Sequence, residues 1–567
     1  MSIESDRECL SQNHNLKRIR HDLKTTELLT VYQWPPKKEG YRDYFFLCAL
    51  IPRDQIEQVL SERNISSGDP ERMGGMPAAF DDYTKEDEKQ VKYLRYGTRE
   101  GFEPLIISRS FGGIRESYNE ISEEFRHFHD LYHNRKTDTY IKTDEDGNER
   151  TVAIVKPNEI QIRLQEIRQF LAIKEMYLSM LFEFNEYSKY TLQELGLNEL
   201  KPEFRRDDLM FWRRDYCGKT PYERFQSDSR LRGRRLIKPL PKSKSGFGDF
   251  AEEPKYVEFI VDVDENGDKV YHTCDPYKLS GGLGENSDSA SRYTIVHFRK
   301  QVLDKYYNEP NKYGVRDSMV CCGSLWSMRI DNHDRDKVCV FLDDLGMLPY
   351  TEQCHWSQPQ YNIPPEGGVS ETFYRRMIQG EWASSDQPDH LFQQSYEQLQ
   401  KACKECLGWQ LLKPFGPGDE YRLKRLRIPT ANEESHFKDL VSDLTSILIE
   451  ALNEECLKNL IPNDQRKDIK RGIGRLEYIL NSQEIAETEK HITFLRCLWD
   501  LRTTRSSSHL EILEDKRYQR AAKHFDLENR NRQEAFAKIL EGAVQFLDFL
   551  SSVVQSGKLS DKNDASC

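Results

Sequence analysis

The sequence lacks an uninterrupted apolar run of about 18 residues, the length that a membrane-spanning helix needs. Its first stretch, MSIESDRECLSQNHNLKRIRH, also lacks the apolar core of a secretory signal. Acidic residues outnumber basic ones by 95 to 83, so the net charge is −12 and the chain as a whole does not attract polyanions. We therefore expect a cytoplasmic protein without membrane contact, in which any contact with nucleic acid depends on local basic patches.

The chain is also poor in the motifs that hold cofactors. Its 13 cysteines are too scattered for a disulfide framework, and Cys403 and Cys406 form a CxxC pair that no second pair answers. The glycines of SRSFGGIRES and SGGLGENS lack the lysine and the spacing of a phosphate-binding loop. We expect free thiols in a reducing compartment, and we predict neither a metal nor any other cofactor.

A chain of 567 residues is long enough for several domains, and its texture changes along its length. The polar residues 1–25 predict a flexible N-terminus. Strand-like segments such as YRDYFFLCALI predict an α+β domain over residues 26–228. The basic segment 229–254 is rich in Pro, Gly and Ser, as is typical of a linker. A β-rich α+β middle domain is expected over residues 255–430, with a hairpin turn at Asn266 and Gly267.

Residues 431–557 have the apolar periodicity of helices. Four helical segments fit this range, which is enough for an all-α bundle. The polar residues 558–567 predict a disordered tail. The expected fold class is therefore multidomain α+β, with mixed α/β N-terminal and middle regions followed by an all-α C-terminal bundle of four-helix type.

A possible catalytic pair lies at the end of the third predicted helix, in LRCLWDLRTTRSSSHLEIL (495–513). Arg502 precedes a run of hydroxyl residues and His509 follows it, while Asp500 is close enough to orient either group. The same Arg-to-His spacing occurs elsewhere in the chain, so the interpretation depends on the rigid helix and the phosphate-binding hydroxyls. The alternative is that the cation and the imidazole only satisfy the last carbonyls of the helix.

This arrangement resembles the higher eukaryote and prokaryote nucleotide-binding (HEPN) superfamily, whose ribonuclease members carry an Arg-x4–6-His motif near a helix end. The resemblance covers residues 432–557 and implies a HEPN-like bundle with metal-independent endoribonuclease activity. His509 would transfer a proton and Arg502 would bind the phosphate, giving 2′,3′-cyclic phosphate and 5′-hydroxyl ends. The resemblance also implies a homodimer and a role as a toxin or in antiphage defence, in which residues before 431 sense a protein or phage-derived trigger.

Side chains near this motif are expected to bind the RNA substrate. Cationic runs neutralise phosphates without regard to sequence, and YRLKRLR (421–427) directly precedes the predicted bundle. The expected RNA-binding residues are Arg422, Lys424, Arg425, Arg427, Arg505, Ser507 and Ser508.

Two other functions stay open. The bundle could serve only for dimerisation, in a non-catalytic RNA-binding or protein-interaction scaffold. The chain could instead be a metal hydrolase centred on His127, His129 and His133, which lie in a predicted helix over residues 117–135. His129 and His133 are four residues apart and could face one metal, although a charged amphipathic helix explains the same pattern.

Overall fold

The computed structural model describes residues 3–35, 42–61, 71, 79–81, 91–93, 96, 100–199, 201–218, 225–247, 253–281, 285–416, 418–466, 469, 471–503 and 516–559. The chain divides into two compact units. The first contains residues 1–144 and 148–253, and the second contains residues 145–147 and 254–567. Across the described residues, no helix combines the length and the apolar character needed to cross a membrane.

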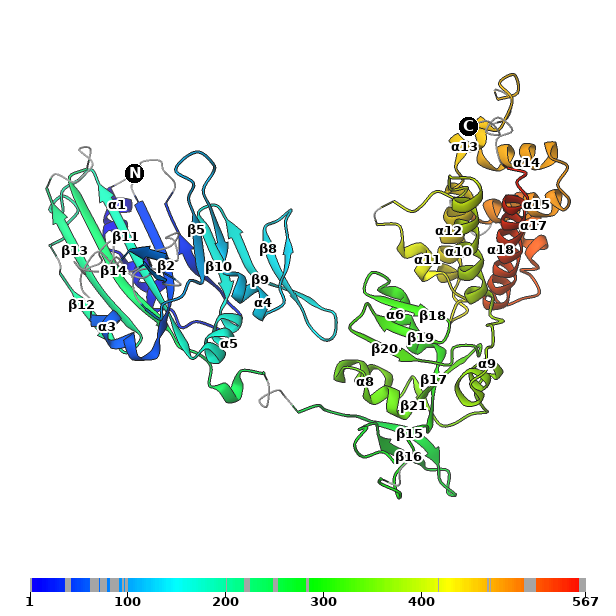
Figure 1. The fold of residues 1–567 in the computed structure, drawn as a ribbon, viewed down its shortest axis with the longest axis horizontal. Helices are drawn as coiled ribbons and strands as arrows, with labels where there is room; N and C mark the ends of the chain where they lie inside the picture. The colour runs from blue at the N-terminus through cyan, green and yellow to red at the C-terminus, as the bar shows by residue number, and fades with distance from the viewer. Residues whose placement is uncertain are drawn as a thin grey trace. The chain divides into compact units, whose positions relative to one another are not determined.

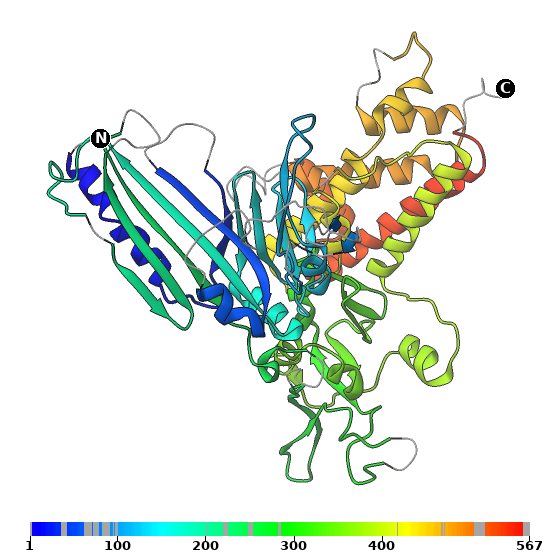
Figure 2. The same cartoon turned by 60° about the vertical axis from the view of Figure 1, so that its left-hand side comes forward.

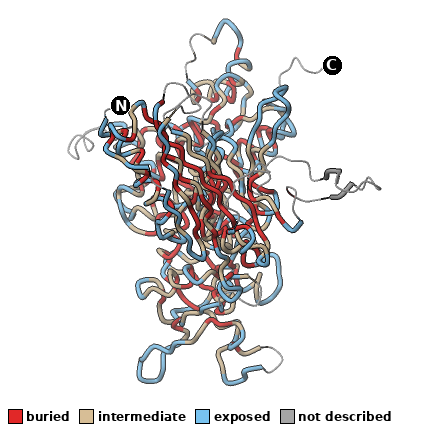
Figure 3. Tube along the Cα trace, turned by 90° about the vertical axis from the view of Figure 1, so that its left-hand side faces the viewer, coloured by how far each residue is buried: buried red, intermediate tan, exposed pale blue. Residues whose placement is uncertain are grey.

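A ten-stranded antiparallel sheet forms the centre of the first unit (Figure 1), in the order β12-β13-β14-β11-β2-β1-β10-β9-β8-β7. Its longest strands lie in the middle and are mostly buried, as Figure 3 shows in red. The strands are β1 Leu28–Gln33, β2 Arg42–Pro52, β7 Tyr132–Asn134, β8 Thr139–Thr143, β9 Glu149–Lys156, β10 Glu159–Arg163, β11 Met176–Ser188, β12 Glu203–Arg206, β13 Leu209–Cys217 and β14 Ser227–Ile237.

Both faces of this sheet are covered, because alternate residues of β2 enter two different apolar clusters. Phe46, Cys48 and Leu50 belong to the larger cluster, while Ala49 and Ile51 belong to the smaller one. Side chains on opposite faces of one strand require two cores. The other elements of this unit are the hairpins β3 Ala79–Asp81 with β4 Val91–Tyr93 and β5 Ile106–Arg109 with β6 Tyr118–Ile121, and the helices α1 Ile3–Leu10, α2 Asn13–Arg20, η1 Arg53–Gln55, α3 Ile56–Ser61, α4 Glu123–Phe128, α5 Leu164–Lys174 and η3 Lys242–Lys244.

The predicted flexible N-terminus is wrong for most of residues 1–25, since α1 and α2 are helices that lie along the sheet (Figure 2). Leu10 is fully buried against Leu192 and Leu195. The Arg213 guanidinium of β13 donates to the carbonyl of Leu10 at 2.8 Å, and the Gln12 amide donates to a carbonyl of β14 at 3.0 Å. The polar sequence suggested disorder because it does not reveal these hydrogen-bond partners, which lie about 200 residues further along the chain.

The predicted linker over 229–254 is also wrong in its first part, because β14 occupies Ser227–Ile237 between β11 and β13. Acidic partners across the sheet neutralise its arginines. Arg234 lies 3.2 Å from Glu71, with both side chains fully buried, and Arg232 lies 2.7 Å from Glu183. A charged stretch therefore forms a central strand. The boundary between the two units lies between residues 253 and 254, at the C-terminal end of the predicted linker.

The second unit begins with short strands and helices packed around Phe298, Tyr306 and Trp356. The predicted hairpin is confirmed, since β15 and β16 pair across Asn266 and Gly267. The elements are β15 Glu258–Val263, β16 Lys269–Thr273, β17 Ile295–Arg299, η5 Lys300–Leu303, α6 Asp304–Asn308, β18 Tyr313–Arg316, β19 Met319–Cys322, β20 Trp326–Arg329, β21 Lys337–Phe341, α7 Leu342–Gly346, α8 Tyr350–Trp356, β22 Asn362–Ile363, α9 Glu371–Phe373 and the π-helical turn η6 Tyr374–Gln379.

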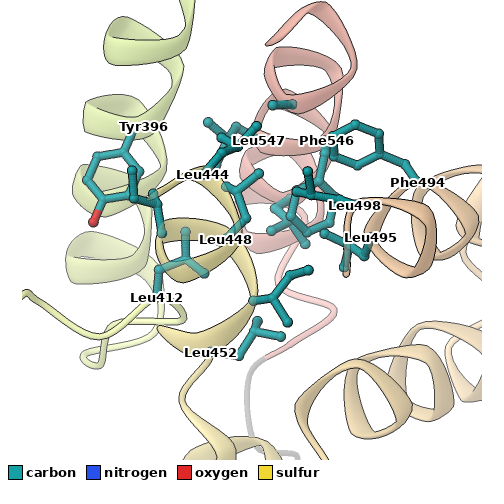
Figure 4. Close-up of a cluster of buried hydrophobic side chains, with 14 of the residues drawn as sticks. Tyr396, Leu412, Leu444, Leu448, Leu452, Phe494, Leu495, Leu498, Phe546 and Leu547 are labelled. Atoms are coloured by element: carbon teal, nitrogen blue, oxygen red, sulfur yellow. The ribbon is translucent and has the colours of Figure 1, made fainter. Parts of the chain in front are cut away.

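A helical region completes the second unit, and its helices share one large apolar core (Figure 4). This core includes Tyr396 of α10, which the predicted boundary at residue 430 would have excluded. The fold is thus mixed α+β, with a large antiparallel sheet and a C-terminal helical region that begins before residue 430. The helices are α10 Pro388–Cys406, α11 Tyr421–Arg425, α12 Glu434–Thr445, the π-helical turn η7 Ser446–Glu450, α13 Glu454–Asn459, α14 Gly472–Ser482, α15 Thr488–Thr503, α17 Lys516–Phe525 and α18 Arg532–Gln555.

Candidate functional site

Arg502 lies in the last turn of α15, where a cation is favoured by the helix dipole. The apolar side of this helix, including Leu495 and Leu498, is buried in the core and fixes its position. The Arg502 Nη1 atom lies 2.5 Å from Glu450 Oε1 of η7, and its guanidinium is 5.8 Å from the ring centroid of Trp499. Because its side chain is 25% exposed, Arg502 combines a rigid support with access from solvent.

Glu450 is the acidic partner of Arg502 in the structure. Its Oε2 atom accepts a hydrogen bond of 2.7 Å from Ser446 Oγ, one π-helical turn earlier. Partial burial acts to raise the pKa of Glu450, but Ser446 and the charges of Arg502 and Arg422 outweigh burial and hold it below its ordinary value. The carboxylate is therefore ionised at neutral pH and neutralises part of the charge of Arg502.

Asp500, the predicted supporting acid, is buried and forms an ion pair with Arg520 of α17. This contact raises the pKa of Arg520 and joins α15 to α17. The structure thus pairs Asp500 with Arg520 and Arg502 with Glu450.

The basic segment 421–427 divides into two parts. Arg422 lies on α11, where its Nη1 donates to Asp443 Oδ1 at 2.7 Å, and Arg425 Nε lies 3.8 Å from Asp443 Oδ2. Lys424 is exposed on the same short helix. Since Arg422 also acts on Glu450, the two predicted site residues Arg422 and Arg502 lie near one carboxylate. These three residues of α11 can take part in a basic surface close to Arg502.

Arg427 is the exception, and its predicted contact with RNA is wrong. Its side chain is only 2% exposed and lies 3.2 Å from Asp304. The guanidinium is also 4.2 Å from the ring centroid of Tyr307. Arg427 therefore joins the segment between α11 and α12 to α6 and has no surface to offer to a phosphate.

Four of the predicted site residues, Arg505, Ser507, Ser508 and His509, lie outside the described residues. The convergence of Arg502 and His509 on one phosphate therefore stays a prediction.

The histidines predicted as an alternative metal site are separated. The predicted helix over 117–135 is instead β6, α4 and β7, so His129 ends α4 while His133 lies in β7. The buried His129 Nε2 is 2.9 Å from the Glu166 carbonyl, and burial lowers the pKa of His129 to about 4. His133 is 2.7 Å from Asp138, and His127 is exposed. The predicted helix is wrong, so the four-residue spacing of His129 and His133 no longer supports a metal hydrolase at these histidines.

A different group of side chains could hold a metal, in the second unit. Asp317 Oδ1 lies 2.8 Å from His333 Nε2 and 3.9 Å from His390 Nδ1. Burial acts to raise the pKa of Asp317, but hydrogen bonds from His333 and Arg376 hold it well below its usual range. Burial acts to lower the pKa of His333, but its two carboxylate partners, Asp317 and Asp331, raise it above its ordinary value.

The CxxC pair is not part of such a group. Cys403 is buried and Cys406 is exposed at the end of α10, and both are free thiols, as are the other cysteines among the described residues. Burial raises the pKa of Cys403, which makes this thiol a poor nucleophile.

Two features of these sites had no signal in the sequence. Glu450 lies 52 positions before Arg502, and Asp317, His333 and His390 come from three separate loops and helix ends. No local spacing links residues that only the tertiary fold brings together.

Comparisons with known proteins add no assignment: no family model, no curated protein and no solved structure matches the chain.

Proposed function

We propose that the C-terminal helical region is a metal-independent endoribonuclease in which Arg502 binds the scissile phosphate and His509 transfers protons. The observation that carries this proposal is the ion pair between Arg502 and Glu450 at the end of a firmly packed helix. An ion pair between partly exposed side chains contributes less than about 1 kcal/mol. A phosphate, which can bind a guanidinium through two oxygens, is therefore able to replace the carboxylate.

The proposed chemistry uses the RNA itself as nucleophile. The 2′-hydroxyl oxygen attacks the adjacent phosphorus while its proton passes to a base, and the 5′-oxygen leaves with a proton from an acid. His509 can serve as either the base or the acid because imidazole titrates near neutral pH. Arg502 would stabilise the negative charge that develops on the non-bridging oxygens. The products are a 2′,3′-cyclic phosphate and a 5′-hydroxyl.

A single imidazole cannot hold both proton positions at once, so we propose that two copies pair and present two motifs to one substrate. Residues 434–503 and 516–559, as far as their side chains are described, expose no large hydrophobic side chain. The proposed homodimer would then depend on polar contacts, with Lys424 and the arginines of α11 guiding RNA toward it. The first unit and the strands of the second would restrain the nuclease until a protein or phage-derived trigger binds, as in toxin or defence systems.

The decisive experiment incubates end-labelled RNA with the purified chain in EDTA. We expect Arg502→Ala and His509→Ala each to reduce cleavage by about 100-fold or more, because each removes a group that acts on the reacting phosphate. The matched control is Arg496→Ala, since Arg496 lies on the same helix and forms a similar ion pair with Glu477 at 2.5 Å. Products of the wild type should carry cyclic phosphate ends.

Equal cleavage by all four proteins would refute the proposal and point to a contaminating nuclease. RNA binding without cleavage, unaffected by His509→Ala, would instead favour the non-catalytic scaffold.

A further inference from the structure

Three side chains with metal-binding atoms meet inside the second unit, in a place that the proposed ribonuclease does not use. Asp317 lies in the turn between β18 and β19, His333 in the loop between β20 and β21, and His390 in the first turn of α10. Their candidate ligand atoms all lie within 4.8 Å of one another. Within the described part of the chain, no other three His, Cys, Asp or Glu side chains come together in this way.

The separations are close to those of a coordination sphere. In tetrahedral zinc sites with bonds of about 2.0–2.1 Å, neighbouring ligand atoms are roughly 3.3 Å apart. The 2.8 Å between Asp317 Oδ1 and His333 Nε2 is shorter than this, and the 3.9 Å between Asp317 Oδ1 and His390 Nδ1 is longer. Small side-chain rotations, of roughly half an ångström at these atoms, would bring both separations to the required value.

Two of the three candidate ligands, His333 and Asp317, are held by a second layer of hydrogen bonds. His333 Nδ1 is 3.1 Å from Asp331 Oδ1, which directs Nε2 of the same ring toward Asp317. Asp331 is itself fixed at 2.7 Å by both the amide and the hydroxyl of Ser370. A carboxylate behind a histidine, with the other nitrogen directed at the metal, is the usual arrangement in zinc proteins.

The hydrogen bonds of Asp317 and His390 differ from each other. Arg376 donates to both oxygens of Asp317, at 2.8 and 2.9 Å. Ser385 Oγ lies 2.8 Å from His390 Nδ1, the atom that also faces Asp317 Oδ1, so a metal at this nitrogen would displace the serine contact. Hydrogen-bonded carboxylates and oriented rings reduce the side-chain entropy that metal binding would otherwise cost.

The competing explanation is a structural ion network in which a proton on His333 Nε2 points at Asp317 Oδ1. A metal ion would occupy the position of that proton, so the same side chains serve both arrangements. The role of His390 differs between the two explanations, because the ion network leaves its Nδ1 on Ser385 and the metal site requires that atom as a ligand. Its side chain is only 6% exposed, and its Nδ1 contacts Ser385 and faces Asp317 without taking part in the network between Asp317, His333 and Asp331.

We propose that Asp317, His333 and His390 bind one divalent transition-metal ion, with Zn²⁺ the best match and water as a fourth ligand. Two imidazoles and one carboxylate suit zinc, whereas Ca²⁺ and Mg²⁺ prefer oxygen ligands. The Asp317 side chain is 20% exposed and gives the ion a path from solvent. The metal would tie α10, the first long helix of the helical region, to the strands of the second unit.

The test titrates Co²⁺ into the full-length chain after chelation and desalting. We expect the wild type to bind one equivalent, with visible bands of cobalt in a nitrogen and oxygen environment. Thiolate-to-cobalt bands would report binding at the free cysteines instead. Zn²⁺ should displace the cobalt. His390→Gln should weaken binding by about 100-fold or more, and Asp331→Asn by about 10- to 100-fold, as second-layer changes do.

The matched control is His355→Gln, because His355 is a partly buried histidine of α8 in the same unit whose Nε2 bonds the Val302 carbonyl. This variant should bind cobalt as the wild type does. Thermal unfolding without metal shows whether each variant folds, and added Zn²⁺ should raise the melting temperature of the wild type but not of His390→Gln. Cobalt binding that is absent in the wild type, or unchanged in a folded His390→Gln protein, would overturn the proposal.

Discussion

Glu186 provides a quantitative test of the first unit, because it is an almost fully buried acid on the central strand β11. Its Oε1 accepts a hydrogen bond from Tyr44, and its Oε2 lies 3.3 Å from Arg42 Nε. Burial raises the pKa of Glu186 to about 7, and these partners compensate for only part of that effect. The position also reports on the packing of α2, because the side-chain amide of Asn15 on that helix donates to Glu186 Oε1 at 3.4 Å.

The sign of the pH dependence follows from the raised pKa. Between the ordinary value of 4.5 and about 7, the folded state binds a proton that the unfolded state has already lost. The contribution of Glu186 to stability is therefore complete below about pH 4.5 and is lost as the pH rises to about 7. The size of this pKa difference corresponds to about 3 kcal/mol.

Glu186→Gln removes this titration while keeping an oxygen that can accept the Tyr44 hydrogen bond. Relative to the wild type, we expect the variant to gain about 2–3 kcal/mol in free energy of unfolding between pH 4.5 and 8. Hydrogen exchange of β11 peptides in urea reports this unit alone, and comparing both proteins at each pH cancels the intrinsic exchange rates. Glu8→Gln, at an exposed position of α1, is the control for the lost charge. A difference between Glu186→Gln and wild type that does not change with pH would refute the reasoning.

Three further predictions test the strand, the helical core and the basic segment. Gly233→Ala should destabilise the first unit by about 3 kcal/mol in urea unfolding, because its Cβ would lie 2.1 Å from the Met210 carbonyl oxygen; a linker would tolerate the change. Leu495→Ala should lower the stability of the helical region by about 2–5 kcal/mol, measured by thermal unfolding, because this side chain is fully buried. Arg427→Met should lower thermal stability but leave RNA affinity unchanged. Lys424→Met should weaken RNA binding in a filter assay without loss of stability. Weaker RNA binding by Arg427→Met, or a stability loss confined to Lys424→Met, would contradict the buried role of Arg427 and the exposed role of Lys424.

The sequence predicted elements well where apolar periodicity was local. The strand that became β2, the hairpin between β15 and β16, and the helix that became α15 were all expected from their own residues. The sequence-based prediction failed where a charged residue forms an ion pair with a residue far away in the chain. Arg234 looked solvent-exposed in a run of cations, but Glu71 makes it part of a buried sheet. Net charge in a window cannot reveal a partner that lies far away in the chain.

The same limit applies to the histidines. The i,i+4 spacing of His129 and His133 predicted one helical face, but α4 ends at Phe128 and the backbone at Asp130 has a positive φ of 50°. That turn directs the two rings to different partners. His333 and His390 share no such pattern, since 56 intervening residues fold into strands and helices before their rings approach to 5.3 Å.

The position of Glu450 shows how a local irregularity of a helix can determine where a side chain lies. Residues 431–557 predicted regular helical periodicity, but α12 passes into the π-helical turn η7 at Ser446–Glu450. A π-helical turn adds one residue to the turn, so every later side chain is rotated by about 100° relative to regular periodicity. In the structure, Ile447 and Leu448 lie in the core and Glu450 meets Arg502. Such turns occur frequently at functional sites. The irregularity that hid Glu450 from the sequence pattern therefore accounts for the position of the carboxylate that pairs with Arg502.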